Sequence, residues 1–307
     1  MYLHLILFGI PCVVVFLSFR KKHHEKKKFP PAAWTTPLIG CLPAVVSKNI
    51  AEEMLKIGKE LGPVVSTHLG FKKLVIVNGV EAFKTALGNP SMAGRTDVLY
   101  KELLGGKGII WNDDVKEIRK FIFKSSRNFE FTGNATESII QEQITSLLQR
   151  LENTNGKPFL VKNIFNIPML NAIFNLLLGS KIPHDDPAFQ KAAKSVELTI
   201  TLPNPIMRAC VLYPPLLNWV PSCLARKDKL EGYLMDVLSL VEKHLQGLVV
   251  NRIPDQPRCF ADALQDKIND TTNESSAFHH KQKQAAPIIF DLIFASIDTT
   301  AAMLEWI

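Results

Sequence analysis

The chain has 307 residues, of which 47% are hydrophobic and 21% are charged. This is the composition of a globular protein, and it excludes an intrinsically disordered chain. The length fits two domains, one large domain or a part of a larger protein. The formal net charge is +7, but +5 of it lies in the first 30 residues. The rest of the chain has too little positive charge for a nucleic-acid binder, so that class is excluded.

The cysteines are odd in number, widely spaced and without any Cys-x-x-Cys pair. This pattern fits neither a disulfide framework nor a zinc site, so we expect a reducing compartment. The five residues are Cys12, Cys41, Cys210, Cys223 and Cys259.

Residues 1–19 contain no formally charged side chain, and the basic cluster RKKHHEKKK follows them at 20–28. A helix of that length covers about 28 Å, which is close to the thickness of the bilayer core. A cleaved signal peptide would have its basic residues before the apolar run. We therefore predict a single-pass transmembrane anchor at 1–19, with a buried core helix as the alternative. Because positive flanks stay cytoplasmic, the bulk of the chain is expected in the cytosol.

Residues 20–37 form a basic and proline-rich linker, because prolines keep the backbone extended and stop the anchor helix. The folded domain is expected over 38–307. Its first part has apolar residues at helical spacing over 49–61, two strand-like runs at 64–69 and 73–77, and a further helix at 80–87. The two runs have the spacing of a β-hairpin.

Helical periodicity dominates from residue 114 onward. The expected helices are 114–127, 135–152, 161–178, 186–200, 228–250 and 287–307. The predicted fold class is therefore mainly α with a small β-sheet near the N-terminus. Residues 267–284 are polar, and we expect them to form a mobile surface loop.

The helix predicted at 287–307 has three acids, each seven residues from the next: Asp291, Asp298 and Glu305. This spacing places them on one narrow stripe. One interpretation is a core helix whose acids bond loops or solvent. A second membrane span is less favoured, because a lipid-facing carboxylate at Asp298 would cost roughly 2.5–3.5 kcal/mol or more.

The same helix has a face with little side-chain bulk, formed by Ala295, Thr299 and Ala302. A flat ligand or a second backbone could approach this face closely, and the Thr299 hydroxyl would be the polar group within reach. That hydroxyl can also bond back to the carbonyl of Ala295 and loosen the helix there. The alternative is that another helix packs against the face.

Residues 294–300, FASIDTT, resemble the oxygen-activation helix of the cytochrome P450 haem-thiolate monooxygenases. The anchor and proline-rich linker resemble the start of microsomal members, and residues 61–70 resemble the first strand of their small sheet. Residues 92–95 resemble the segment whose arginine reaches a haem propionate. Residues 116–121 resemble their helix C, in the animal microsomal clan that includes xenobiotic and steroid hydroxylases. The implied fold is a cytochrome P450 truncated after its central oxygen-activation helix and preceded by one transmembrane helix.

The resemblance implies a haem b site and its proton donors. Arg95 and Arg119 would pair with the haem propionates, since guanidinium groups form short, charge-assisted bonds to carboxylates. Val115 takes the cofactor-binding position at which the family usually has tryptophan. Asp298 and Thr299 would supply or relay protons to dioxygen, so that its O–O bond breaks.

The resemblance also implies a lipophilic small-molecule substrate and a redox partner. Substrate contacts are expected from Leu103, Ile109, Ile110, Ala295 and Ile297, and Ala295 would also contact the cofactor. Electrons from NADPH would arrive through NADPH-cytochrome P450 reductase at the endoplasmic reticulum membrane. A basic face could dock that partner, although a merely solvated face is an equal alternative. This face consists of Lys116, Lys120, Lys124 and Arg127.

Several features depart from the family pattern. Ser296 and Ile297 replace residues that are usually glycine and threonine or glycine. No cysteine has the Phe-x-x-Gly frame of the thiolate ligand, so the 307-residue chain contains no expected metal ligand. Without that ligand we expect no monooxygenase activity from these residues alone, and apolar faces of 287–307 would lack partners. The alternatives are a non-catalytic short isoform that competes for the reductase or membrane partners, and an unrelated single-pass helical interaction protein.

Overall fold

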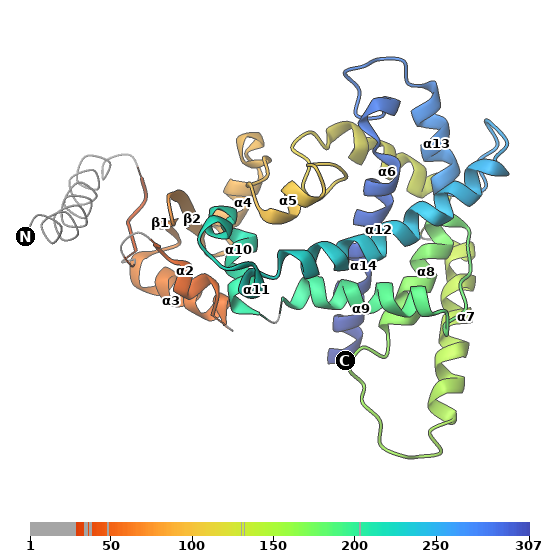
Figure 1. The fold of residues 1–307 in the computed structure, drawn as a ribbon, viewed down its shortest axis with the longest axis horizontal. Helices are drawn as coiled ribbons and strands as arrows, with labels where there is room; N and C mark the ends of the chain where they lie inside the picture. The colour runs from red at the N-terminus through yellow and green to blue at the C-terminus, as the bar shows by residue number, and fades with distance from the viewer. Residues whose placement is uncertain are drawn as a thin grey trace, which may run out of the picture. The chain divides into compact units, whose positions relative to one another are not determined.

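The computed structural model (Figure 1) describes residues 29–33, 36, 39–47, 49–129, 131, 133–202 and 204–307. The predicted anchor at 1–19 and much of the predicted linker lie outside these residues. The chain divides into two compact units, and the expected domain 38–307 contributes to both. One unit comprises Met1–Gly94 and Asn204–Val220, and the other comprises Arg95–Pro203 and Pro221–Ile307.

The first unit contains the predicted β-hairpin, formed by β1 (Val64–Leu69) and β2 (Lys72–Val77). The strands are antiparallel, and Leu69 pairs with Lys72 across the turn. Gly70 has a φ of +55° there, and a Cβ atom at this position would collide with the ring of Tyr213. The turn therefore needs glycine both for its backbone conformation and for the close approach of the tyrosine.

Short helices complete the first unit. They are α2 (Leu42–Val45), α3 (Ile50–Leu61), α4 (Val80–Leu87), α10 (Pro205–Leu212) and the 3₁₀ turns Pro90–Met92 and Pro214–Asn218. Helix α10 begins at a proline, and the side chain of Asn204 accepts hydrogen bonds from the first free amides. This cap explains why the helix begins there. A small core joins Cys41 and Val45 to Leu69 of the hairpin.

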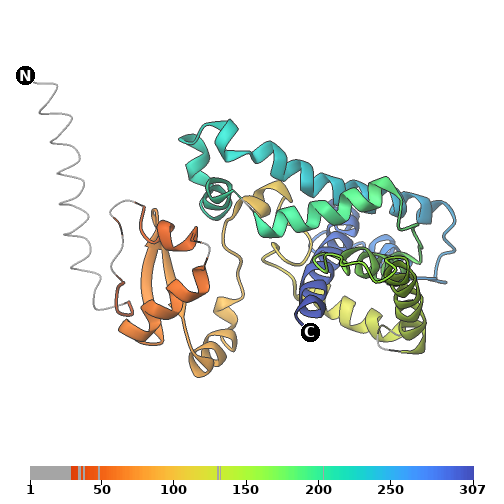
Figure 2. The ribbon, with the colours of Figure 1, turned by 90° about the horizontal axis from the view of Figure 1, so that it is seen from below.

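The second unit is helical throughout its described residues (Figure 2). Its elements are α5 (Leu99–Leu103), α6 (Lys116–Asn128), α7 (Asn134–Glu152), α8 (Asn166–Leu178), α9 (Pro187–Thr201), α11 (Ser222–Ala225), α12 (Lys227–Val250), α13 (Phe260–Asp270), the 3₁₀ turn His280–Gln282 and α14 (Ala285–Trp306). Helices α9 and α12 lie side by side in both views, and α14 packs on α8 and α12.

The core of the second unit lies where α8, α12 and α14 meet. Phe174 of α8, Val241 of α12 and Ile293 of α14 are fully buried in one cluster. Complete burial of a large aliphatic or aromatic side chain contributes roughly 1.5–3 kcal/mol. Since α14 supplies one wall of this core, its packing against α8 and α12 sets its position.

The structure confirms a mainly helical fold with one small antiparallel sheet. One expectation is wrong, and another holds only in part. Residues 267–284 are not a mobile surface loop, because 267–270 end α13, Phe278 is fully buried and its ring lies 5.2 Å from that of Phe121. The apolar residues of 287–307 have partners only in part: those from Ile288 to Ala301 include a buried stripe against the core, whereas Met303, Leu304, Trp306 and Ile307 are exposed. In both segments apolar side chains pack against core residues that lie far away in the sequence.

Candidate functional site

The low-bulk face of α14 is exposed in the structure. Ala295, Thr299 and Ala302 are all exposed, whereas Ile293 and Ile297 on the opposite side are completely buried in the core. No described helix covers this face, so the packing alternative does not apply within the residues placed here. Ile297, an expected substrate contact, lies in the core cluster.

Thr299 makes the hydrogen bond to the preceding turn that the sequence predicts. Its Oγ1 donates a hydrogen bond to the carbonyl of Ala295 at 2.7 Å. Ser296, where the family pattern has glycine, donates from its Oγ to the carbonyl of Leu292 at 2.6 Å. Both hydroxyls compete with the backbone amides for helical carbonyls. The exposed Thr299 oxygen still has lone pairs with which to accept a proton or a hydrogen bond.

Asp298 lies beside Thr299 and is half-buried. Burial, together with the carboxylates of Glu197 and Glu305, raises the pKa of Asp298 above the ordinary value. Burial disfavours the charged form, and two like charges disfavour it further. Asp298 therefore keeps its proton to a higher pH than a solvated aspartate, as a proton donor requires.

Arg119 is exposed on α6, one turn after Val115, whose carbonyl accepts from the Arg119 backbone amide at 2.8 Å. Its side chain makes no hydrogen bond or ion pair with the described residues. The preceding residue of α6, Ile118, is fully buried. The helix thus directs Arg119 outward from a fixed position, and its donors are available for an anionic group.

Arg95 is held by the segment that follows α5. Its Nε donates to the carbonyl of Ile110 at 2.8 Å, and its backbone amide donates to Asp113 at 2.8 Å. Lys101 bonds the same Asp113 carboxylate at 2.6 Å and, with the Arg95 amide, lowers the pKa of Asp113. Arg95 and the predicted substrate contact Ile110 therefore form one local unit.

Asp291 was not expected at the site from the sequence. Its Oδ2 accepts hydrogen bonds from the backbone amides of Ile109 at 2.5 Å and Ile110 at 2.8 Å. Beside it, Gln284 accepts from the Gly108 amide at 2.9 Å. Burial is the main effect on Asp291, and it raises the pKa to about 6. The feature of the sequence that could have pointed to Asp291 is the seven-residue spacing of Asp291, Asp298 and Glu305.

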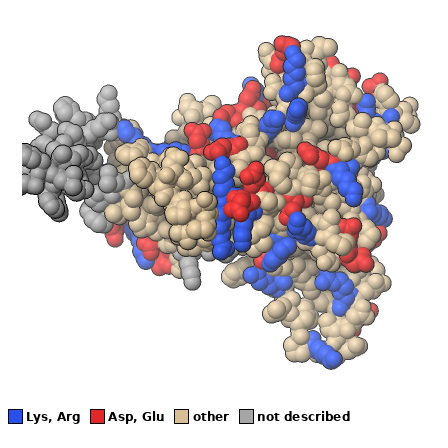
Figure 3. Space-filling view, viewed as in Figure 1, with Lys and Arg blue, Asp and Glu red and all other residues tan. Residues whose placement is uncertain are grey.

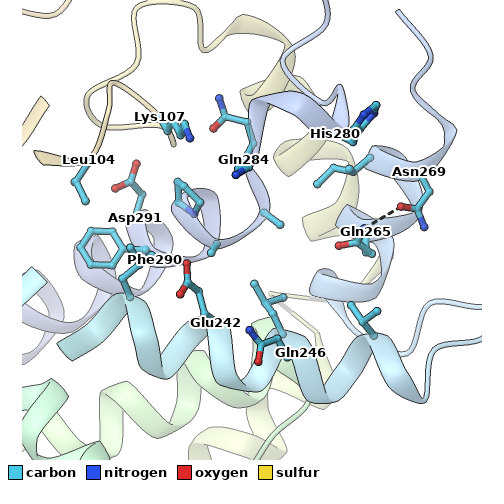
Figure 4. Close-up of a pocket in the computed structure, with 18 of the residues that line it drawn as sticks. Leu104, Lys107, Glu242, Gln246, Gln265, Asn269, His280, Gln284, Phe290 and Asp291 are labelled. Carbon is cyan, nitrogen blue, oxygen red and sulfur yellow. Dashed lines mark hydrogen bonds between the residues drawn. The ribbon is translucent and has the colours of Figure 1, made fainter. Parts of the chain in front are cut away.

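A cavity of about 740 Å³ lies between α12, α13 and the first turns of α14 (Figure 4). Leu103, one of the expected substrate contacts, lines it, whereas Ile109 and Ile110 do not. Asp291 and Glu242 place carboxylates in its wall. The expected substrate residues are therefore divided between the cavity and the segment bonded to α14.

The basic face predicted on α6 is present. Lys116, Lys120, Lys124 and Arg127 are all exposed. On the face shown in Figure 3, lysines and arginines are interspersed with acidic side chains. A local basic cluster on α6 suits the docking of an acidic protein.

Comparisons with known proteins bear on the family of this chain. The family model "Cytochrome P450" matches residues 30–307. Cytochrome P450 2C25 of Mesocricetus auratus is 28% identical over 98% of this chain and 62% of its own length. Cytochrome P450 2C16 of Oryctolagus cuniculus is 26% identical over 96% of this chain and 60% of its own length. The chain thus spans about 60% of the length of these relatives.

Proposed function

Because the chain belongs to the cytochrome P450 family, we propose that it works as part of a haem-dependent monooxygenase that inserts one oxygen atom from O₂ into a lipophilic small molecule. The observation that carries this proposal is the exposed face of Ala295, Thr299 and Ala302 on a helix whose other side packs into the core. A cytochrome P450 is a haem protein, so haem b is the cofactor of the intact enzyme.

The described residues fit a haem group. A flat macrocycle needs a surface without bulky side chains, which Ala295 and Ala302 supply. Its propionates need cationic donors, and Arg119 is exposed on α6 without a partner among the described residues. Arg95 is half-buried near Ile110 and would hold the second propionate. Charge-assisted bonds of this kind are the strong ones in proteins.

When bound, haem supplies the redox chemistry that activates dioxygen. The chain's own contribution is to hold and move protons. The raised pKa lets the Asp298 carboxyl group hold a proton more readily than a solvated aspartate, and Thr299 presents a hydroxyl on the next residue. General acids placed in this way contribute roughly 10²–10⁴-fold to a reaction rate.

The thiolate ligand is proposed to come from a segment outside residues 1–307. Cys41, Cys210 and Cys259 are buried, and burial raises the pKa of each thiol. A raised pKa disfavours the thiolate, which is the form that binds iron. Among the described residues no group of histidine, cysteine and acidic side chains suits a metal ion.

Substrate and partner contacts are part of the same proposal. We assign the substrate to Leu103, Ile109, Ile110, Ala295 and Ile297, of which Ile297 is fully buried in the core. The exposed basic face of α6 would receive NADPH-cytochrome P450 reductase, and residues 1–19 would anchor the protein in the endoplasmic reticulum membrane. Family membership argues against the alternative of an unrelated interaction protein.

Spectroscopy tests the proposal. We expect residues 1–307 to bind added haemin, and Arg119→Ala to weaken that binding about tenfold, because a hydrogen bond to a charged group is lost. Arg127→Ala changes another exposed arginine of α6 and serves as the matched control, with unchanged binding expected. Equal affinities for the two variants would contradict the role of Arg119.

A second measurement tests the source of the thiolate. The reduced carbon-monoxide difference spectrum should show no thiolate band for residues 1–307. A band should appear when a segment with the Phe-x-x-Gly and cysteine pattern is joined to them. A thiolate band from residues 1–307 alone would refute the assignment, and no haem binding by either protein would refute the monooxygenase proposal.

A further inference from the structure

We propose that Glu117 is a positioning residue that fastens α6 to the segment between α13 and α14 and thereby sets the rotation of α6, which carries Arg119. We call this segment, residues 271–284, the strap (Figure 1). The inference rests on the proposed function for the meaning of Arg119, whereas the contacts of the strap involve no cofactor. Glu117 and Arg119 both lie near the start of α6.

The strap begins with a turn that its sequence explains. The side chain of Asn273 accepts a hydrogen bond from the backbone amide of Ser275 at 3.0 Å, and the carbonyl of Asn273 accepts from the amide of Ser276 at 3.1 Å. Asparagine favours such turns because its side chain can bond the backbone two residues further on. The Oγ of Ser276 then accepts from the amide of Phe278 at 3.1 Å. These local bonds fix the direction of the Ser276 hydroxyl and of the amide that follows it.

The Glu117 carboxylate accepts from both groups that this turn presents. The Ser276 hydroxyl lies 2.8 Å from Oε1 and 2.9 Å from Oε2, and the amide of Ala277 donates to Oε2 at 3.0 Å. Hydrogen bonds to a charged acceptor are shorter and stronger than neutral ones. Glu117 is half-buried and forms no ion pair with another described residue, although Lys120 stands three residues further along the same helix. The carboxylate therefore serves the strap.

An aromatic contact holds the strap to α6 independently of Glu117. Phe278 is fully buried, and its ring meets that of Phe121 edge to face with the centroids 5.2 Å apart. The ammonium group of Lys267 on α13 lies 5.6 Å from the centroid of the Phe278 ring. Phe121 lies one turn after Glu117, so both contacts are on the same side of α6. Two chemically different contacts thus fasten the strap along one edge of the helix.

The edge of α6 that the strap holds faces away from Arg119. At about 100° per residue, Arg119 lies about 160° around the helix from Glu117, with the buried Ile118 between them. A rotation of α6 by about 20° would move a group about 6 Å from the helix axis by about 2 Å. Such a shift exceeds the range of hydrogen-bond distances. The strap therefore determines whether Arg119 reaches an anionic group at a fixed place.

Hydrogen exchange of the whole chain, read at single amides, tests the attachment. In Glu117→Ala we expect the amide of Ala277 to exchange about tenfold faster or more, because it loses a charged acceptor. Ser276→Ala should accelerate the amide of Phe278, which loses its own acceptor, and that of Ala277 to a smaller extent. Ser275→Ala changes the neighbouring exposed serine and should leave both amides unchanged. Unchanged exchange at Ala277 in a folded Glu117→Ala chain would overturn the proposal.

The conservative variant separates the role of the acceptor from a general loss of stability. Glu117→Gln keeps an oxygen that can accept from the Ala277 amide but removes the charge. Exchange at Ala277 should therefore lie between that of the unaltered chain and that of Glu117→Ala. Circular dichroism establishes that each variant is folded. If Glu117→Ala does not fold, Glu117→Gln and Ser276→Ala decide the question, and unchanged exchange in both would contradict the attachment.

Haemin titration tests the connection to Arg119. Arg119→Ala should weaken binding about tenfold, and Glu117→Ala should weaken it about threefold, with a smaller loss in Glu117→Gln. Because Glu117 acts through Arg119, the double variant should bind no more weakly than Arg119→Ala alone. Additive losses, or an unchanged affinity in Glu117→Ala, would refute the connection. If even the unaltered chain binds no haemin, the proposed function fails and the connection fails with it, whereas hydrogen exchange still decides whether Glu117 holds the strap.

Discussion

Three acids at equal spacing on α14 have three different environments. Asp291 bonds the loop before α6, Asp298 is half-buried near other carboxylates, and Glu305 accepts a hydrogen bond from the backbone of Asn163. The shared stripe places them on one side of the helix, but each turn meets a different neighbour. Acidic residues on one stripe thus accept backbone hydrogen bonds at Asp291 and Glu305, whereas Asp298 is a half-buried carboxyl group with a raised pKa.

Asp291 should make stability depend on pH. Its pKa is about 6 in the folded chain against 3.8 for the ordinary group. The folded state therefore binds more protons than the unfolded state between these values, and the free energy of unfolding falls as pH rises from about 4 to about 6, by up to about 3 kcal/mol. Asp291→Asn should remove this slope.

The measurement is urea unfolding at several pH values across that window. Asp270→Asn changes an exposed aspartate of α13 and should keep the slope of the unaltered chain. A slope that persists in Asp291→Asn would show that another group titrates there.

At the scale of elements, α14 combines membrane-like composition with a core position. Ala285–Trp306 is long and apolar enough to cross a membrane. Its tertiary contacts account for this composition, because Phe290, Ile293 and Ile297 are buried against α8 and α12. The helix is apolar because it lies inside the second unit, and its small residues are left for the exposed face.

Substitutions on the two faces of α14 should differ sharply. Ile293→Ala removes a completely buried side chain and should lower the free energy of unfolding by about 2–5 kcal/mol. Met303→Ala changes a side chain that is 67% exposed and should alter it by less than about 0.5 kcal/mol. The midpoints of urea unfolding of the two variants test this difference in stability. Equal losses would mean that α14 does not occupy the core position described here.

At the scale of the whole molecule, the folded part is attached to a predicted anchor. The matched family region begins at residue 30, just after the basic cluster. The proposed membrane attachment is the predicted anchor at residues 1–19, which lies outside the described residues. The attachment would keep the exposed face of α14 and the basic face of α6 on the cytosolic side.

Deletion of residues 1–28 should release the protein from membranes. We expect the full chain to remain in the pellet after alkaline carbonate extraction and the shortened chain to appear in the supernatant, because about 20 apolar residues supply the insertion energy. Deletion of residues 20–28 alone should keep the protein in the pellet but disturb its orientation. A shortened chain that still resists carbonate would place the anchor elsewhere.

Local patterns in the sequence were sufficient to predict most helices and strands. The helices near 50–61, 116–128 and 227–250 and the hairpin agree with their predicted bounds to within two residues. The periodic spacing of apolar residues is visible among neighbouring residues of the sequence, and the same apolar side chains pack in the core. The exposed face of Ala295 and Thr299 could be predicted for the same reason, since residues four apart on one helix share a face.

The tertiary structure alone decided which long-range partners these elements meet. Asp291 and Ile109 lie 182 residues apart, and no local rule connects them. Phe278 lies in a polar segment yet fills the core, and Ile297 lies beside the exposed face yet points away from it. The sequence determines which side chains share a face of each helix. Burial and hydrogen bonding between distant segments determine the environment, and therefore the chemistry, of those side chains.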